Sequence, residues 1–134
     1  VQYLSKGKFK KLLEPKEKLL IDGCHSIGSG QNLYDYLKTL KEPVYGIWGM
    51  QKNKLPVHFI KSFKNIFKKI ITVTIPEEPN ALSAEKLKSI AQKYGSAEAA
   101  SSIEDALKKL SSKENKTIVI FGSLYLIGKV LSKN

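Results

Sequence analysis

The segment 19–37, LLIDGCHSIGSGQNLYDYL, places an aspartate and a histidine between an apolar run and a helical pattern. Asp22 can accept hydrogen bonds from ribose hydroxyls, and His25 can stack on a base or donate to a ligand oxygen. Alternatively, Asp22 caps the following turn and His25 is a partly exposed loop residue. The residue types fit both interpretations.

Two other segments carry candidate side chains directly after apolar runs. Gly122 and Ser123 precede a helical pattern, and free N–H groups at a helix start can receive a carboxylate or phosphate. A tight turn with Ser123 as the N-cap fits equally well. In the segment 49–54, Lys52 can support a phosphate. The lysines of this region are otherwise typical of a solvated face: Lys52, Lys54, Lys61, Lys64, Lys68 and Lys69.

The other reactive side chains favour structural roles. His58 has no cysteine or carboxylate at metal-ligand spacing, which indicates packing or a surface position. Cys24 has no base two or three residues away on a strand-to-helix elbow, so we expect a small buried thiol and no nucleophile.

Glycine-rich phosphate motifs are incomplete or absent. Gly28 and Gly30 begin a dinucleotide fingerprint, but Leu33 occupies the place of its third glycine. Neither GxxxxGKS nor GxxxxGKT occurs anywhere in the chain. The chain alone is therefore not expected to grip a nucleoside triphosphate with a phosphate loop.

Length and charge restrict the remaining possibilities. The 134 residues fit one domain over residues 1–134, and no apolar stretch nears the roughly 20 residues of a bilayer span, so we expect no membrane partner. The formal net charge is +11, yet all 23 basic residues are lysines, spread over every segment. Without arginine, sequence-specific nucleic-acid binding is disfavoured. The single cysteine excludes an internal disulfide and fits a cytoplasmic location.

Short apolar runs alternate with helical patterns. The runs lack polar alternation, as strands buried on both faces do: residues 19–21, 44–50, 70–75 and 117–121. Apolar stripes at helical spacing lie after them: Leu33, Leu37 and Leu40; Ile60, Phe63 and Phe67; Leu87, Ile90, Ala91 and Tyr94; Ile103, Ala106, Leu107 and Leu110; Leu124, Ile127 and Leu131. Ser83 and Ser102 are expected as N-caps, with Gly95 as a helix stop.

The order of elements predicts the fold class. It reads strand, helix, strand, helix, strand, helix, helix, strand, helix, and residues 1–15 fit either a short edge strand or a hairpin. Such alternation predicts an α/β, Rossmann-like three-layer domain with a mostly parallel sheet flanked by helices. Open parallel sheets bind ligands beyond the carboxyl ends of their strands. Segments 22–30, 49–54 and 122–123 are therefore expected to meet at one edge.

Four segments together resemble, in order and spacing, the carboxyl-terminal domain of folylpolyglutamate synthase and of the related bifunctional dihydrofolate synthase, within the Mur ligase superfamily. They are LLIDGCHSIGSGQNLYDYL, VYGIWGMQKNK, TIPEEPNALSAEKL and IVIFGSLYLIGKVL. The sharpest parts are DGCH at residues 22–25, similar to the family's D-G/V-A-H-N-P segment, and GSLYL at residues 122–126, similar to its G-S-L-Y-L terminus.

The resemblance implies an ATP-dependent ligase. Such an enzyme phosphorylates the terminal carboxylate of a folate or dihydropteroate, and the amine of L-glutamate then displaces the phosphate. A separate amino-terminal domain holds the phosphate loop, Mg²⁺ and most of the folate site, and the carboxyl-terminal domain closes over it. The family's Gly-Arg pair, whose arginine contacts ATP, precedes the residues that resemble Val1 and Gln2. The chain is thus expected to be part of a longer polypeptide and to lack ligase turnover alone.

The resemblance also implies residue roles. Asp22 would bind the ribose of ATP, His25 would lie against the nucleotide, and Ser123 would face the active site or the incoming glutamate. Two departures affect the fine geometry: the family's Asn-Pro after the histidine is SI at residues 26–27, and its D-K-D loop is QKN at residues 51–53.

Two other hypotheses stay open. The first is a freestanding Rossmann-like module whose lysine surface holds an acidic partner or nucleic acid. Steep loss of DNA or heparin affinity with rising salt would identify it. The second is the equivalent domain of a Mur ligase, which shares the architecture but is not expected to end in GSLYL.

Overall fold

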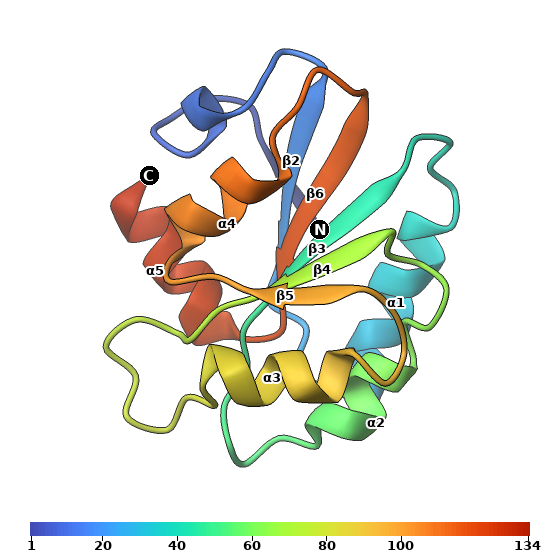
Figure 1. Cartoon of the computed structure of the whole chain (residues 1–134), viewed down its shortest axis with the longest axis vertical. Helices are drawn as coiled ribbons and strands as arrows, with labels where there is room; N and C mark the ends of the chain where they lie inside the picture. The colour runs from blue at the N-terminus through green and yellow to red at the C-terminus, as the bar shows by residue number, and fades with distance from the viewer.

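A six-stranded sheet forms the centre of the computed structural model, which describes residues 1–134 (Figure 1). The strand order is β1-β2-β6-β3-β4-β5, and only β1 runs antiparallel to its neighbour. The strands are β1 Gln2–Leu4, β2 Glu17–Asp22, β3 Val44–Trp48, β4 Lys69–Thr72, β5 Ala97–Ala99 and β6 Lys116–Phe121. The predicted mostly parallel sheet is confirmed.

Helices cover both faces of the sheet, which gives the predicted three layers (Figure 1). One face holds α1 Ile27–Leu37, α2 Pro56–Lys61 and α3 Ala84–Ala91. The other face holds α4 Ile103–Leu110, α5 Leu124–Lys133 and the short 3₁₀ helix η1 Lys10–Leu12. None of these helices combines the length and the apolar character that crossing a bilayer requires.

The central strand β6 explains why the apolar runs lack polar alternation. All six of its side chains are buried. Ile118 and Ile120 join the core on the side of α4 and α5, whereas Val119 and Phe121 join the core beneath α1, α2 and α3. Since helices cover both faces, consecutive apolar residues are all buried.

Serine side chains begin four of the helices. Ser83 and Ser102 each accept a hydrogen bond from the backbone N–H three residues later, at 3.1 Å and 3.0 Å, so both predicted N-caps are confirmed. Ser26 and Ser123 cap α1 and α5 in the same way. Each hydroxyl satisfies N–H groups that the first helical turn leaves without a partner.

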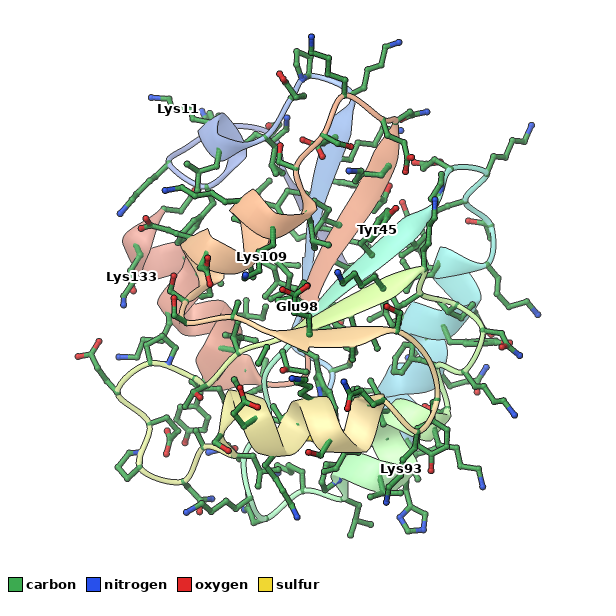
Figure 2. The ribbon with its side chains drawn as sticks, in the orientation of Figure 1. Lys11, Tyr45, Lys93, Glu98, Lys109 and Lys133 are labelled. Atoms are coloured by element: carbon green, nitrogen blue, oxygen red, sulfur yellow. The ribbon has the colours of Figure 1, made fainter.

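The prediction that one helix directly follows another between residues 83 and 117 is wrong, because β5 lies between α3 and α4. β5 is only AEA, and alanine and glutamate are depleted in strands, so no strand signal marks it. It forms one edge of the sheet, where Glu98 contacts Lys69 at 2.8 Å and Lys109 at 3.3 Å (Figure 2). At the opposite edge, residues 1–15 form the short strand β1 followed by η1.

Three predicted helical stripes extend past the ends of the helices. α2 ends two residues before Phe63, so Phe63 and Phe67 reach the core from the turns that follow. Leu40 and Tyr94 likewise lie beyond α1 and α3, and α3 ends four residues before the expected stop at Gly95. The turns after each helix keep these side chains directed toward the sheet. The apolar residues therefore continue at helical spacing although the helix itself has ended.

A buried ion pair joins the amino-terminal ends of β2 and β6. Glu17 and Lys116 are paired in the strand register, and their Oε2 and Nζ atoms lie 3.0 Å apart. Glu17 also accepts hydrogen bonds from the Ser111 hydroxyl at 2.6 Å and from the backbone N–H groups of Glu14 and Ser112 at 2.8 Å and 2.9 Å. The carboxylate therefore has four donors, which compensate for its removal from water.

Candidate functional site

The parallel register brings the three predicted segments to one edge of the sheet. Asp22 pairs with Phe121, Phe121 pairs with Trp48, and Trp48 pairs with Thr72. The loops that follow β2, β6 and β3 therefore start side by side, and Gly49 donates a hydrogen bond to the Phe121 carbonyl at 3.3 Å. The expectation that segments 22–30, 49–54 and 122–123 meet is confirmed.

Asp22 caps the turn that follows β2. Its Oδ1 accepts a hydrogen bond from the Cys24 N–H at 2.9 Å, and its Oδ2 lies 3.2 Å from the amino nitrogen of Val1. The side chain stays 15% exposed, so it has access to solvent at the carboxyl edge. An ionised carboxylate offers about four acceptor sites, so the turn leaves capacity for a further donor.

His25 lines a hollow between two of the three segments. This hollow has a volume of about 280 Å³, and its walls come from both the α1 start and the loop after β3: His25, Ser26, Ile27, Asn53, Lys54, Leu55 and Phe59. The His25 backbone is held by a hydrogen bond to the Ser29 hydroxyl at 3.3 Å. The half-buried imidazole therefore faces a space that a planar or polar group can enter.

The loop that carries Lys52 is tied to the loop between β4 and α3. The Lys52 N–H donates to the Asn80 carbonyl at 2.7 Å, and the Leu82 N–H donates to the Met50 carbonyl at 2.9 Å. The Asn80 side chain donates to Asn53 at 3.2 Å. Lys52 itself is exposed and does not line the hollow at His25, whereas Lys54 from the same loop does.

Sequence reasoning missed Asn80 as a part of this site. Its side chain and its carbonyl act across 27 and 28 residues of sequence, and spacing within one segment gives no sign of such contacts. The one indication in the sequence is that Asn80 belongs to the segment TIPEEPNALSAEKL, which carries part of the resemblance to the folate ligases.

Gly122 allows β6 and β3 to approach closely at the edge. Its φ of 114° lies in the region that glycine adopts readily, and a Cβ there would collide with the Gly49 carbonyl oxygen and lie 2.6 Å from Trp48 Cδ1. Ser123 follows and is 3% exposed. Its hydroxyl oxygen accepts from Tyr125 and Leu126 N–H groups at 3.1 Å and 3.4 Å, so the N-cap interpretation of Ser123 is confirmed.

The remaining reactive side chains have the expected structural positions. Cys24 is buried, and burial together with the nearby negative charge of Asp22 raises the pKa of its thiol. A thiol that stays protonated is a poor nucleophile. His58 is exposed on α2. Nowhere in the chain do three His, Cys, Asp or Glu side chains gather as a metal site would require.

Apolar side chains surround the carboxyl edge and project into solvent. They lie just before or at the starts of three helices: Ile27 is 49% exposed, Leu55 66%, Leu124 65% and Tyr125 58%. Large exposed apolar side chains that gather in one region mark a surface for contact with another protein surface. This edge therefore combines polar groups with an apolar rim.

The chain matches the family model of the dihydrofolate synthetase C-terminal domain over residues 5–133. It belongs to this family. The match confirms the resemblance to the folate ligases and favours it over a Mur ligase domain. No curated protein sequence matches the chain.

Solved structures share the fold of this dihydrofolate synthetase C-terminal domain. Folylpolyglutamate synthase from Thermotoga maritima matches with a TM-score of 0.76 and 25% identity, covering 98% of this chain and 29% of its own. The Mycobacterium tuberculosis folylpolyglutamate synthase complexed with ADP and AMPPCP matches with 0.76 and 18%, covering 86% and 29%. E. coli FolC in complex with DHPP and ADP matches with 0.76 and 17%, covering 90% and 29%. The chain spans 29% of the length of each.

Proposed function

We propose that this chain is the nucleotide-closing domain of an ATP-dependent folylpolyglutamate synthase that also acts as a dihydrofolate synthase in the cytoplasm. The observation that supports this most is the family match, together with the position of Asp22, His25 and the 49–54 loop at the carboxyl edge, where His25 and Lys54 line one hollow. Nucleotides bound in the matching structures agree with it: the M. tuberculosis folylpolyglutamate synthase holds ADP and AMPPCP, and E. coli FolC holds ADP.

The proposed reaction has two steps. An oxygen of the folate or dihydropteroate carboxylate attacks the γ-phosphorus of ATP, and ADP leaves. The amine nitrogen of L-glutamate then attacks the acyl carbon, an amide bond forms, and inorganic phosphate leaves. Mg²⁺ neutralises charge on the phosphates when it is bound. In the proposal, a separate phosphate-loop domain of the same polypeptide holds the metal and most of the folate site.

The residues of this chain bind and orient the nucleotide in the proposal. Asp22 accepts hydrogen bonds from the ribose hydroxyls, since Cys24 already fixes the orientation of its carboxylate. His25 lies against the base at the hollow, and Lys52 places its ammonium near the phosphates. Ser123 acts by starting α5 at the edge, and its O–H stays available as a donor toward glutamate.

In the proposal, closure of this domain on the phosphate-loop domain excludes water from the active site. The apolar rim of Ile27, Leu55, Leu124 and Tyr125 fits a surface that is covered when the phosphate-loop domain approaches. Exclusion of water protects an acyl phosphate from hydrolysis. The isolated chain should therefore show no ligase turnover, because it lacks both the positioning of the phosphates and the charge stabilisation.

Substitutions in the full-length protein test the site. We expect Asp22→Asn and His25→Ala each to raise the KM for ATP at least about tenfold and to lower kcat. Asp22→Asn loses a hydrogen bond to a charged group, worth about 1.5–3 kcal/mol, and His25→Ala loses stacking on the base, worth about 1–3 kcal/mol. Asp22→Asn preserves an acceptor for the Cys24 N–H, so the turn is maintained. The more drastic Asp22→Ala should impair turnover at least as much.

His58→Ala is the matched control, since it removes an exposed imidazole from α2. It should leave both kinetic constants unchanged. Wild-type kinetics in Asp22→Asn, Asp22→Ala and His25→Ala would show that the residue assignment is wrong. Absence of glutamate ligation by the full-length wild-type protein would reject the proposed activity itself.

A further inference from the structure

A second hollow lies at the amino-terminal ends of β3 and β4, at the end of the sheet opposite to the carboxyl edge that carries Asp22. It has a volume of about 530 Å³, within the range of about 300–1,000 Å³ that small-molecule sites occupy. Three pieces of chain form it: the last turn of α1, residues 40–44 before β3, and residues 64–68 before β4. Nothing in the proposed ligase reaction uses this space.

Lysine side chains give the hollow a positive rim. Lys38, Lys64 and Lys68 all line it, and only Lys68 lies within 4.0 Å of a carboxylate oxygen, that of Glu114. The ammonium of Lys38 lies over the Tyr34 ring at 5.2 Å from its centroid, which orients it without neutralising its charge. Two cationic groups are therefore free to meet an anion.

The one carboxylate in the wall of the hollow is already paired. Glu42 accepts a hydrogen bond from the Thr117 hydroxyl at 2.8 Å and lies 3.5 Å from the Lys18 ammonium. Its side chain is only 11% exposed. The rim thus carries three positive groups against one negative group whose charge is balanced by Lys18.

Part of the wall is apolar, although polar groups make up more of its exposed lining. The apolar members are the buried Leu37 and Val44 and the more exposed Tyr34, Leu40, Pro43, Ile66 and Phe67. Asn65, with a φ of 70°, turns the chain between Lys64 and the wall residue Ile66. A body with rings fits against such a wall, whereas a small inorganic ion would contact only the lysines.

We propose that this hollow, defined by Tyr34, Lys38, Lys64, Asn65 and Phe67, is a second binding site for a small organic anion with an aromatic body. The ring system lies against the apolar wall, and a carboxylate, sulfonate or phosphate group meets Lys38 and Lys64. The inference is independent of the ligase proposal, since the hollow shares no lining residue with the hollow at His25.

The test titrates the 134-residue chain with 1-anilinonaphthalene-8-sulfonate, whose fluorescence rises on leaving water. One saturable site is expected, with backbone amide shifts at Lys38, Asn65 and Phe67 in ¹H–¹⁵N spectra. The double variant K38Q/K64Q should weaken the affinity about twofold to thirtyfold, because each of the two exposed ion pairs contributes about 0.2–1 kcal/mol.

A matched double variant removes the same charge elsewhere. K11Q/K93Q alters two exposed lysines on other parts of the surface, as Figure 2 shows, and should change the affinity less than about twofold. Equal weakening by both double variants would overturn the proposal, since the probe would then respond to net charge alone. Amide shifts confined to the His25 hollow would also overturn it.

Two further probes examine the chemical class. N-phenyl-1-naphthylamine has the same rings without the sulfonate, and it should bind more weakly than the anionic probe and respond little to K38Q/K64Q. Inorganic sulfate should displace the anionic probe only at much higher concentration. Displacement by sulfate at equal concentration would contradict the contribution of the apolar wall.

Discussion

The two ends of the β2–β6 pair differ in how they treat charge. At the amino-terminal end, Glu17 is 0% exposed and has four hydrogen-bond or ion-pair donors. At the carboxyl end, Asp22 is 15% exposed and has two such donors, the Cys24 N–H and the amino nitrogen of Val1. At the amino-terminal end of these strands, the buried carboxylate of Glu17 therefore stabilises the fold. At the carboxyl end, the Asp22 carboxylate keeps acceptor sites that a ligand can use.

The largest effect is expected from Glu17→Gln. The substitution leaves Lys116 buried without a counter-charge, which should lower the free energy of unfolding by about 3–5 kcal/mol. Urea unfolding followed by circular dichroism measures it. The double variant E17L/K116M should lose much less than the sum of the two single variants, because no unpaired charge is left. A loss below about 1 kcal/mol for Glu17→Gln would contradict the comparison.

Protonation of Glu17 at low pH should remove the same stabilising interactions. Burial raises the pKa of Glu17, but hydrogen bonds from Ser111, Glu14, Ser112 and Lys116 outweigh it and hold the pKa below its ordinary value of 4.5. The stabilisation is therefore complete above about pH 4.5 and is lost as the pH falls through the lowered folded-state pKa. Unfolding curves of wild type and E17Q measured from pH 7 downward should converge; parallel curves would disprove the assignment.

At the carboxyl end, Gly122→Ala tests whether close approach is required. The positive φ and the collision with the Gly49 carbonyl should cost about 2–3 kcal/mol. Gly128→Ala is the control, since Gly128 lies within α5 and no atom lies within 4 Å of an added Cβ. It should raise stability by about 0.5–1 kcal/mol. Similar urea midpoints for both variants would refute the argument.

Ser26→Ala should produce a smaller change. Ser26 and Ser29 form a reciprocal capping box at the start of α1, and loss of the Ser26 hydroxyl should cost about 1 kcal/mol in thermal or urea unfolding. Ser102→Ala, at the start of α4, removes an equivalent cap and should cost a similar amount. In the full-length protein only Ser26→Ala should also alter the KM for ATP, because Ser26 adjoins His25.

The smallest change in stability is expected from the candidate ligand-binding residues themselves. Asp22→Asn and His25→Ala should each alter the free energy of unfolding by less than about 0.5 kcal/mol, since neither leaves a buried group without a partner. A loss of 2 kcal/mol or more in either variant would show that the carboxyl end, like the amino-terminal end, serves stability.

Most of the fold follows from the sequence because burial has a simple pattern. Helices on both faces force consecutive apolar residues into β6, and such runs are visible without a structure. β5 could not be found in the same way. Three residues with a central glutamate are held at the edge by pairing with β4 and by ion pairs to Lys69 and Lys109. Those interactions are tertiary and have no local signal.

The candidate site likewise contains residues that the sequence predicts and others that depend on tertiary contacts. Asp22 ends β2, and His25 and Ser123 lie three and two residues after their strands, so the rule for parallel sheets places all three at one edge. The support given to Lys52 by Asn80 depends on how two loops from different strands meet, which neither periodicity nor residue type reveals. The Ser123 hydroxyl illustrates another limit, because an N-cap and a ligand contact call for the same residue type at the same position.

Both outer strands of the sheet are only three residues long, and one of them carries Glu98 between two lysines. A free strand edge invites another chain to extend the sheet, which is how many β-containing proteins begin to aggregate. Here the unpaired backbone is too short, and on the β5 side too charged, to template such growth. A concentrated solution of this lysine-rich chain should consequently resist amyloid-like self-association as long as β1 and β5 stay folded.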